Sequence, residues 1–218
     1  MKIAVIGAGA MGSIYASFLS KNNNEVLVID IWEEHLEAIK NNGLRVSGFS
    51  GDNVVKNINV SSNIEDAKGY ELFIIATKAS GVGTVASKLS EITNDDSLIL
   101  TIQNGLGAGE RIAKYMPTNN ILLGVAQGFG AAMKGPGHAH HNNMSMIRIG
   151  EMNGGITERL EKLVNFSCER LNIKRFVCWD CVSGIKGLIN EQGKFSNNPL
   201  GVLNWLKEQS SEVSTVLL

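Results

Sequence analysis

The chain begins Met1-Lys-Ile-Ala-Val-Ile-Gly-Ala-Gly-Ala-Met-Gly-Ser13, and this stretch decides its fold. A short apolar run indicates a buried strand, and it leads directly into three glycines spaced as G-x-G-x-x-G, after which the pattern becomes helical. The first glycine allows a tight turn, the second lets the backbone approach a pyrophosphate, and the third lets the helix pack closely on the strand. We therefore expect a dinucleotide-binding loop at the N-terminus of a helix, made by Gly7, Ala8, Gly9, Ala10, Met11 and Gly12.

Strand and helix patterns alternate through the first two-thirds of the chain. Continuous apolar runs at 25–29, 72–76 and 98–102 are typical of parallel strands buried on both faces. Short strands are also expected at 43–46 and 54–60. The series predicts an α/β fold of the Rossmann type, with a doubly wound, mostly parallel sheet.

The character of the sequence changes after residue 127. The segment 128–149 is rich in glycine and polar residues, and we expect it to add antiparallel strands to the same sheet. We predict a dinucleotide-binding Rossmann domain over 1–177 and a short helical C-terminal segment over 178–218.

Composition limits the class of protein. The 218 residues carry a formal net charge of −1, which argues against nucleic acid as the main partner. No run approaches the ~20 apolar residues that span a membrane. Met1 and Lys2 lead directly into the first strand, which leaves no signal peptide, and the cysteine count of 3 is odd. We expect a cytoplasmic protein with reduced thiols and no membrane partner.

The candidate cofactor residues beyond the glycine loop follow later strands. Asp30 closes the second strand, where a carboxylate accepts hydrogen bonds from the ribose hydroxyls and repels a 2′-phosphate, so it favours NAD over NADP. Lys78 follows the run at 72–76 and can offset this preference by binding a phosphate. Asn104 follows another parallel strand and is expected near the nicotinamide. A surface role for Asp30 or Lys78 remains the alternative.

Two groups of metal-ligand residue types are not expected to bind metal. His138, His140 and His141 stand in a polar segment without a fourth ligand, and we expect a loop at the rim of the site or on the surface. Cys178 and Cys181 form C-x-x-C without a second ligand pair.

Several motifs in order resemble the ketopantoate reductase (2-dehydropantoate 2-reductase) family. The resemblance covers about three-quarters of the chain and rests on Gly7-Ala-Gly-Ala-Met-Gly12, Ala76-Thr-Lys-Ala79, Gln103-Asn-Gly-Leu-Gly107, Gly135-Pro-Gly-His138 and Ile149-Gly-Glu151. It implies reduction of 2-dehydropantoate to pantoate by NAD(P)H, in pantothenate and coenzyme A synthesis. Family members more often use NADPH, with a basic residue where this chain has Asp30.

The resemblance also implies roles for residues near the C-terminus. Lys186 and Asn190 keep the family's spacing of lysine to asparagine, which places both on one helical face. By this match Lys186 is the general acid that protonates the carbonyl oxygen, and Asn104 and Asn190 help hold substrate and cofactor. The family's helical domain continues beyond the position of Leu218, so the resemblance implies a truncated helical domain.

Three functions stay open from the sequence. The leading one is reduction of 2-dehydropantoate; the others are reduction of another small keto acid and a dinucleotide-binding module without catalysis. Apolar residues near the end of the chain favour burial in a homodimer or against the Rossmann domain: Leu200, Val202, Leu203, Trp205 and Leu206.

Overall fold

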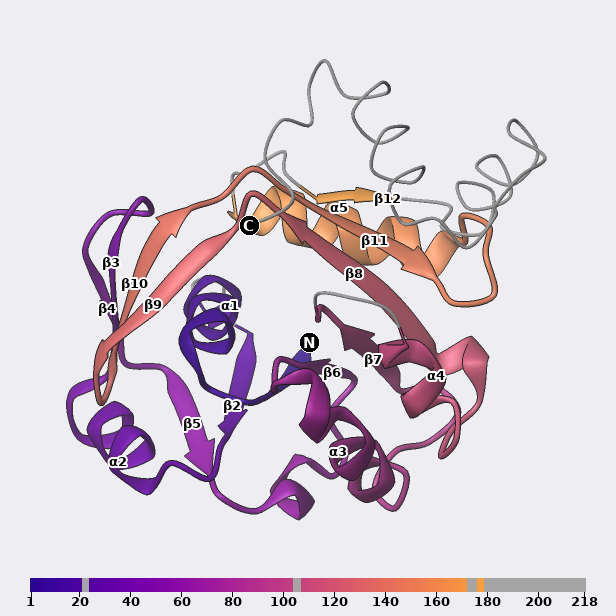
Figure 1. Cartoon of the computed structure of the whole chain (residues 1–218), viewed down its shortest axis with the longest axis horizontal. Helices are drawn as coiled ribbons and strands as arrows, with labels where there is room; N and C mark the ends of the chain where they lie inside the picture. Colours follow the sequence, from indigo (N-terminus) through magenta and orange to yellow (C-terminus); the bar gives the residue numbers. More distant parts are fainter. Residues whose placement is uncertain (21–23, 104–106, 172–175, 179–218) are drawn as a thin grey trace, which may run out of the picture.

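The fold is described from a computed structural model of the chain, which describes residues 1–20, 24–103, 107–171 and 176–178. In this part of the chain a main sheet has the strand order β12-β11-β8-β7-β6-β1-β2-β5 (Figure 1). All neighbouring pairs are parallel except β11 with β8. The strands are β1 (Lys2–Ile6), β2 (Glu25–Ile29), β5 (Ile58–Ser61), β6 (Leu72–Ile75), β7 (Leu98–Thr101), β8 (Ile121–Gln127), β11 (Met146–Glu151) and β12 (Phe176–Cys178).

The central strands are buried on both faces, which explains their continuous apolar runs. In β1, Ile3 and Val5 face one hydrophobic cluster, whereas Ala4 and Ile6 face the other. This alternation follows from the two-residue period of a strand. The predicted Rossmann-type, mostly parallel sheet is confirmed.

Helices cover both faces of the main sheet. Residues of α1 and α5 belong to the cluster that contains Ile3 and Val5, and residues of α3 and α4 belong to the opposite cluster. The helix α1 is followed by β2, and α3 by β7, as expected for crossover connections between parallel strands. The helices are α1 (Ala10–Ser20), α2 (Glu33–Asn42), α3 (Val82–Leu89), α4 (Ala108–Ile112) and α5 (Glu158–Leu171), and the short 3₁₀ helices are η1 (Ile64–Ala67), η2 (Ala79–Gly81) and η3 (Thr118–Asn120).

A second sheet lies beside α1, with the order β4-β3-β10-β9 (Figure 1). Its outer pairs are antiparallel, whereas β3 and β10 pair in parallel, with Arg45 opposite His138 and Ser47 opposite His140. Its strands are β3 (Leu44–Gly48), β4 (Asn53–Val55), β9 (Gly130–Gly135) and β10 (His138–Asn143).

The second sheet corrects two expectations from the sequence. The segment 128–149 does not join the main sheet as a whole, because β9 and β10 pair with β3 and only β11 extends the main sheet. The single strand expected at 54–60 is two strands in different sheets: β4 pairs with β3, and β5 pairs with β2. The first error arises because the pairing of β3 with β10 joins segments far apart in sequence and leaves no local pattern. The second arises because one stretch of sequence contains two short strands that pair with different partners.

Most of the predicted C-terminal segment, 178–218, lies outside the described residues, and the boundary at 177 stays a prediction. Among the residues that the structure describes, no helix is long and apolar enough to cross a membrane.

Candidate functional site

The candidate site lies where four parallel strands end side by side. Ile6 of β1 is opposite Ile29 of β2 and Ile75 of β6, and Ile75 is opposite Thr101 of β7. The segments that follow these strands therefore meet at the carboxyl edge of the sheet, which is where open α/β sheets bind ligands.

The three glycines of the loop differ in what surrounds them. A Cβ placed at Gly12 would lie 1.8 Å from the Gly7 carbonyl oxygen, and one at Gly7 (φ +99°) would lie 2.8 Å from the Thr77 nitrogen. A Cβ at Gly9 would have no atom within 4 Å. Gly7 and Gly12 are thus required by the protein's own packing, whereas Gly9 borders open space on the outer side of the loop.

Hydrogen bonds hold the loop between β2 and α1. The Gly7 N–H donates to the Ile29 carbonyl (2.8 Å), and the Ser13 N–H donates to the Gly9 carbonyl (2.9 Å), which starts α1. The Ser13 hydroxyl donates to the Ala8 carbonyl (2.9 Å). The helix α1 therefore starts within the glycine loop. The N-terminus of a helix offers N–H groups and the positive end of the helix dipole to an anion.

Asp30 follows β2 and binds the glycine loop directly. Its Oδ2 accepts a hydrogen bond from the Ala8 N–H (2.5 Å), and its Oδ1 accepts one from the Trp32 N–H (2.9 Å). Asp30 is half-buried. A carboxylate has about four acceptor positions, so Asp30 keeps capacity for further donors such as ribose hydroxyls.

Lys78 is exposed and lies between β6 and η2, at the same edge of the sheet. The backbone of the neighbouring Thr77 lies against the loop, because its nitrogen is the atom that a Cβ on Gly7 would meet first. The Thr77 hydroxyl is buried and has no hydrogen-bond partner among the described residues. The exposed Lys78 thus lies at the edge where the loop is, while the Thr77 backbone packs against the loop.

Gln103 is a positioning residue that the sequence analysis missed. Its Nε2 donates to the carbonyls of Ile75 (2.6 Å) and Thr77 (3.1 Å), and its Oε1 accepts a hydrogen bond from the Thr101 hydroxyl. The side chain thus ties the end of β7 to the segment that carries Lys78. Gln103 begins the motif Gln103-Asn-Gly-Leu-Gly107, but the sequence predicted a functional role only for the neighbouring Asn104.

Three of the candidate residues cannot be placed. Asn104, Lys186 and Asn190 lie outside the described residues, so the structure brings together only the glycine loop, Asp30 and Lys78.

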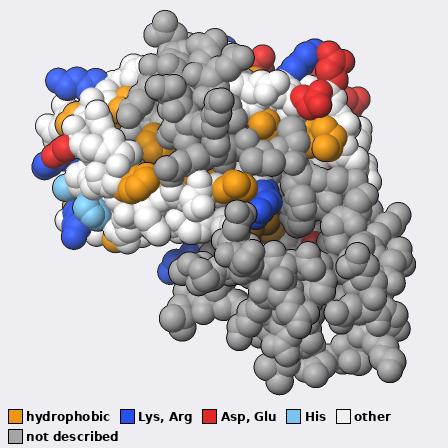
Figure 2. All heavy atoms as spheres, turned by 90° about the horizontal axis from the view of Figure 1, so that it is seen from above, with side chains coloured by type: hydrophobic (Ala, Val, Ile, Leu, Met, Phe, Trp, Pro, Cys, Tyr) orange, Lys and Arg blue, Asp and Glu red, His pale blue; other side chains and the backbone are white. Residues whose placement is uncertain are grey.

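The three histidines of β10 are in a strand, and the expectation of a polar loop is wrong. Neighbouring residues of a strand point to opposite faces, so His141 is fully buried against Phe18, Phe49 and Phe129, while His138 and His140 are half-buried. At the surface, histidine side chains lie beside Lys and Arg side chains (Figure 2). Within the described ranges, no group of three or more His, Cys, Asp or Glu side chains could hold a metal ion.

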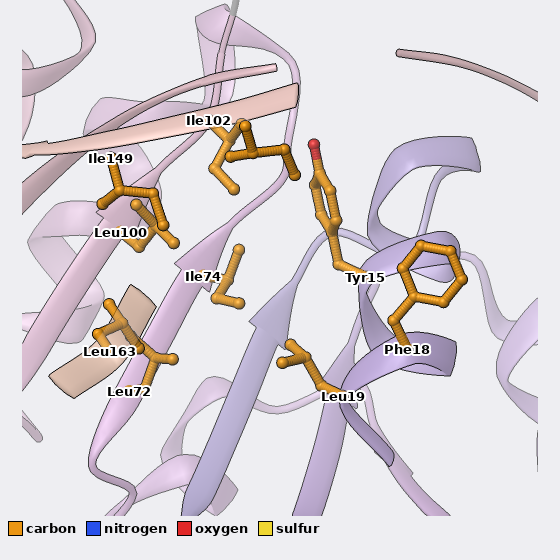
Figure 3. A pocket seen from close by; sticks show the side chains of 10 residues that line it. Tyr15, Phe18, Leu19, Leu72, Ile74, Leu100, Ile102, Ile149 and Leu163 are labelled. Atoms are coloured by element: carbon orange, nitrogen blue, oxygen red, sulfur yellow. The ribbon is translucent and has the colours of Figure 1, made fainter. Parts of the chain in front are cut away.

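An apolar cavity of about 30 Å³ lies between α1 and the main sheet (Figure 3). Tyr15, Phe18 and Leu19 line it from α1, and the opposite wall comes from strands of the main sheet, with Leu163 of α5. Burial raises the pKa of Tyr15. The cavity holds about one or two water-sized groups, so it is too small for a dinucleotide or a keto acid.

Comparison with known proteins identifies relatives of the chain. The family model for Ketopantoate reductase PanE/ApbA matches residues 3–154. A 2-dehydropantoate 2-reductase of Lactococcus lactis is 33% identical over 177 residues, which are 80% of this chain and 56% of that protein. A 2-dehydropantoate 2-reductase of Streptococcus pyogenes is 34% identical over 152 residues, 70% of this chain and 48% of that protein. The chain thus spans about half the length of the curated relatives it matches.

Solved structures of two kinds of enzyme resemble the chain. The 2-dehydropantoate 2-reductase of Geobacter metallireducens is 27% identical with a TM-score of 0.75, over 83% of this chain and 58% of that one. A D-mandelate dehydrogenase, solved with NADH and anilino(oxo)acetate, is 28% identical with a TM-score of 0.73, over 84% of this chain and 58% of that one. The family match and the identity to these relatives show that the chain belongs to the ketopantoate reductase PanE/ApbA family.

Proposed function

We propose that the protein is an NAD(P)H-dependent oxidoreductase that reduces a 2-keto acid, with 2-dehydropantoate as the leading substrate and pantoate as product. The observation that carries this proposal is the contrast between the glycines of the loop. Protein atoms crowd Gly7 and Gly12, whereas Gly9 faces open space where a pyrophosphate can approach the backbone.

The described residues fit a dinucleotide. The N-terminus of α1 would bind the pyrophosphate, and Asp30 would accept hydrogen bonds from the ribose hydroxyls through its remaining acceptor positions. When bound, the reduced nicotinamide supplies the hydride for the keto carbon. The protein's part is to orient the dinucleotide and the substrate and to deliver a proton.

The choice between NADH and NADPH depends on Asp30 and Lys78. A carboxylate at the end of β2 repels a 2′-phosphate, so Asp30 favours NADH, whereas the exposed Lys78, between β6 and η2, can attract that phosphate. The D-mandelate dehydrogenase solved with NADH supports the first possibility. We propose NADH as the preferred cofactor, with NADPH as the family's more common one.

The proton would come from Lys186, with Asn104 and Asn190 holding substrate and cofactor, as the resemblance implies. An ammonium beside the carbonyl oxygen stabilises the developing negative charge and can donate the proton. These three residues lie outside the described part of the chain, and their roles rest on the sequence motifs alone.

A second candidate is reduction of a different 2-keto acid. A D-mandelate dehydrogenase is as similar to this chain in structure as the 2-dehydropantoate 2-reductases, so the scaffold is compatible with more than one substrate class. We also propose a cytoplasmic location, and burial of the apolar C-terminal residues in a homodimer or against the Rossmann domain.

Fluorescence titration with NADH and NADPH, followed by addition of 2-dehydropantoate or benzoylformate, tests the proposal. We expect dinucleotide binding and consumption of the reduced cofactor with one of the two acids. Lys186→Ala should lose turnover and keep binding. Binding without turnover on either acid would favour a dinucleotide-binding module without catalysis.

A further inference from the structure

His35 is a fully buried histidine in the first turns of α2, a helix whose outer face is exposed. The buried polar atoms of a folded protein are almost always hydrogen-bonded, and those of His35 contact two separate parts of the fold. Neither the sequence motifs nor the proposed reaction assigns it a role.

One ring nitrogen of His35 contacts the second sheet. Its Nδ1 accepts a hydrogen bond from the Gly137 N–H (2.8 Å) in the turn between β9 and β10. Gly137 has a φ of +70°, and a Cβ there would lie 3.0 Å from the Cβ of Ala38, so the turn sits directly on α2. Because Nδ1 is an acceptor, the neutral ring carries its proton on Nε2.

The other ring nitrogen faces the glycine loop. His35 Nε2 lies 3.4 Å from the Ser13 hydroxyl, and that hydroxyl donates to the Ala8 carbonyl (2.9 Å). The direction of each hydrogen bond is therefore set: Nε2–H donates to Ser13, and Ser13 donates to Ala8. Trp32 stacks on the ring, with centroids 4.9 Å apart, and so holds its plane.

The orientation of the Ala8 carbonyl decides where the next N–H points. In a trans peptide the C=O and the following N–H point in opposite directions. Because Ser13 holds the Ala8 carbonyl inward, the Gly9 N–H is directed away from Ser13, on the side of the loop opposite α1. Open space surrounds the Cβ position of Gly9.

We propose that His35 is a positioning residue of the dinucleotide site, which couples the β9–β10 turn to the glycine loop through Ser13 and thereby aims the Gly9 N–H at the pyrophosphate. The inference rests on the proposed function, because it assumes that the loop binds a dinucleotide. His35 itself contacts no ligand in this arrangement; it acts through Ser13 and Ala8.

Three variants of the full chain separate this role from simple stabilisation. Ser13→Ala cuts the link at the loop and leaves the His35–Gly137 hydrogen bond. His35→Asn keeps an acceptor near the Nδ1 position but has no donor that reaches Ser13. His35→Gln carries an amide N–H at about the distance of Nε2. Glu37→Gln, an exposed change on the same helix, serves as the control.

The readouts are the Kd for NADH by fluorescence titration and the Tm, measured separately. We expect Ser13→Ala and His35→Asn each to raise the Kd about fivefold, the effect of about one lost hydrogen bond. The double variant should bind no more weakly than the weaker single variant, because both changes cut one path. His35→Gln should bind more tightly than His35→Asn at a similar Tm.

The outcomes that overturn the inference are distinct from failure of the proposed function. If the wild-type chain binds NADH and all variants bind with its Kd, the role of His35 is overturned and the proposed function stands. The role of His35 is also overturned if the effects of Ser13→Ala and His35→Asn on the Kd add fully in the double variant. It is overturned as well if the Kd changes in proportion to the Tm across the variants. If the wild-type chain binds neither NADH nor NADPH, both the inference and the proposed function fail.

Discussion

The backbone N–H of Ala8 donates to the carboxylate of Asp30 across 2.5 Å, so the residue expected to bind ribose also holds the glycine loop. The second carboxylate oxygen accepts from the Trp32 N–H (2.9 Å), at the start of α2. Asp30 therefore joins the glycine loop, the end of β2 and the start of α2. A change at this position alters both the shape of the loop and the charge that a cofactor meets.

Asp30→Asn should weaken both the fold and the preference for NADH. The amide keeps one acceptor but loses the charge, and a hydrogen bond to a charged group contributes about 1.5–3 kcal/mol. We expect a loss of about 1.5 kcal/mol in the free energy of unfolding and a shift of the NADH-to-NADPH affinity ratio toward NADPH. Urea unfolding and paired titrations measure the two effects. Asp52→Asn, at an exposed ion pair with Arg45, is the matched control and should change neither quantity noticeably.

Alanine at two glycines of the loop should have opposite consequences. Gly9→Ala adds a Cβ in open space, so the protein should unfold at nearly the wild-type urea concentration and lose dinucleotide affinity. Gly12→Ala places a Cβ 1.8 Å from the Gly7 carbonyl oxygen, which forces the loop and α1 apart. Urea unfolding should therefore show a large loss of stability for Gly12→Ala alone. Equal stabilities of the two variants would contradict the packing described for this loop.

Gln103→Met should destabilise the carboxyl edge of the sheet. The change keeps the approximate volume but removes the donor for the carbonyls of Ile75 and Thr77. A fully buried polar group without a partner costs about 1–3 kcal/mol, and these carbonyls are part-buried, so we expect a loss of about 1 kcal/mol in urea unfolding. Thr101→Val removes only the hydrogen bond to the Gln103 Oε1 and should cost less. If Thr101→Val loses more stability than Gln103→Met, Gln103 is not the residue that connects β7 to β6.

Arg159→Leu should expose the cost of a buried carboxylate. Glu151 is 3% exposed and is held by the Arg159 guanidinium and the Thr157 hydroxyl. Burial raises the pKa of Glu151, whereas its hydrogen bonds with Arg159 and Thr157 lower it. The lowering effects together outweigh the effect of burial, so the pKa lies below its ordinary value. Removing Arg159 should cost about 2 kcal/mol, reduced from the fully buried case because the arginine is partly exposed. Lys162→Leu, at the exposed pair with Glu158, is the control and should have little effect on urea unfolding.

Stability should fall as the pH drops below the ordinary value of 6.5 for histidine, in part because of His35. Burial lowers the pKa of His35, against the opposing effects of the Asp30 carboxylate and the Ala8 backbone. The unfolded chain then binds a proton at pH values where the folded protein does not, so ΔG of unfolding decreases with falling pH in that window. Urea unfolding at pH 7.5, 6.5 and 5.5 measures the slope. A slope in His35→Asn as steep as in the wild type would show that His35 is not responsible.

Local patterns in the sequence predicted most strands of the main sheet and the position of the glycine loop. The run before Gly7, the G-x-G-x-x-G spacing and the acid after the second strand predicted the loop and the place of Asp30, because each depends on neighbouring residues. The second sheet was not predictable in this way. The pairing of β3 with β10 depends on contacts between residues about 90 positions apart, and the polar composition of β10 gave no strand pattern that identified a partner.

The same limit applies to the residues that support the site. Gln103 and His35 make hydrogen bonds with backbone groups of distant segments, and a single glutamine or histidine in a sequence does not show such contacts. The buried His141 is a further example, since its place among three phenylalanines follows only from the pairing of the second sheet.

A titration of the wild-type chain and Gly9→Ala with NADH and NADPH, by fluorescence at equal protein concentration, tests the central claim most directly. The account predicts that the wild type binds at least one dinucleotide and that Gly9→Ala, folded to the same extent by circular dichroism, binds it much more weakly. Equal binding by the two proteins, or no binding by the wild type, would contradict the assignment of the glycine loop as the dinucleotide site.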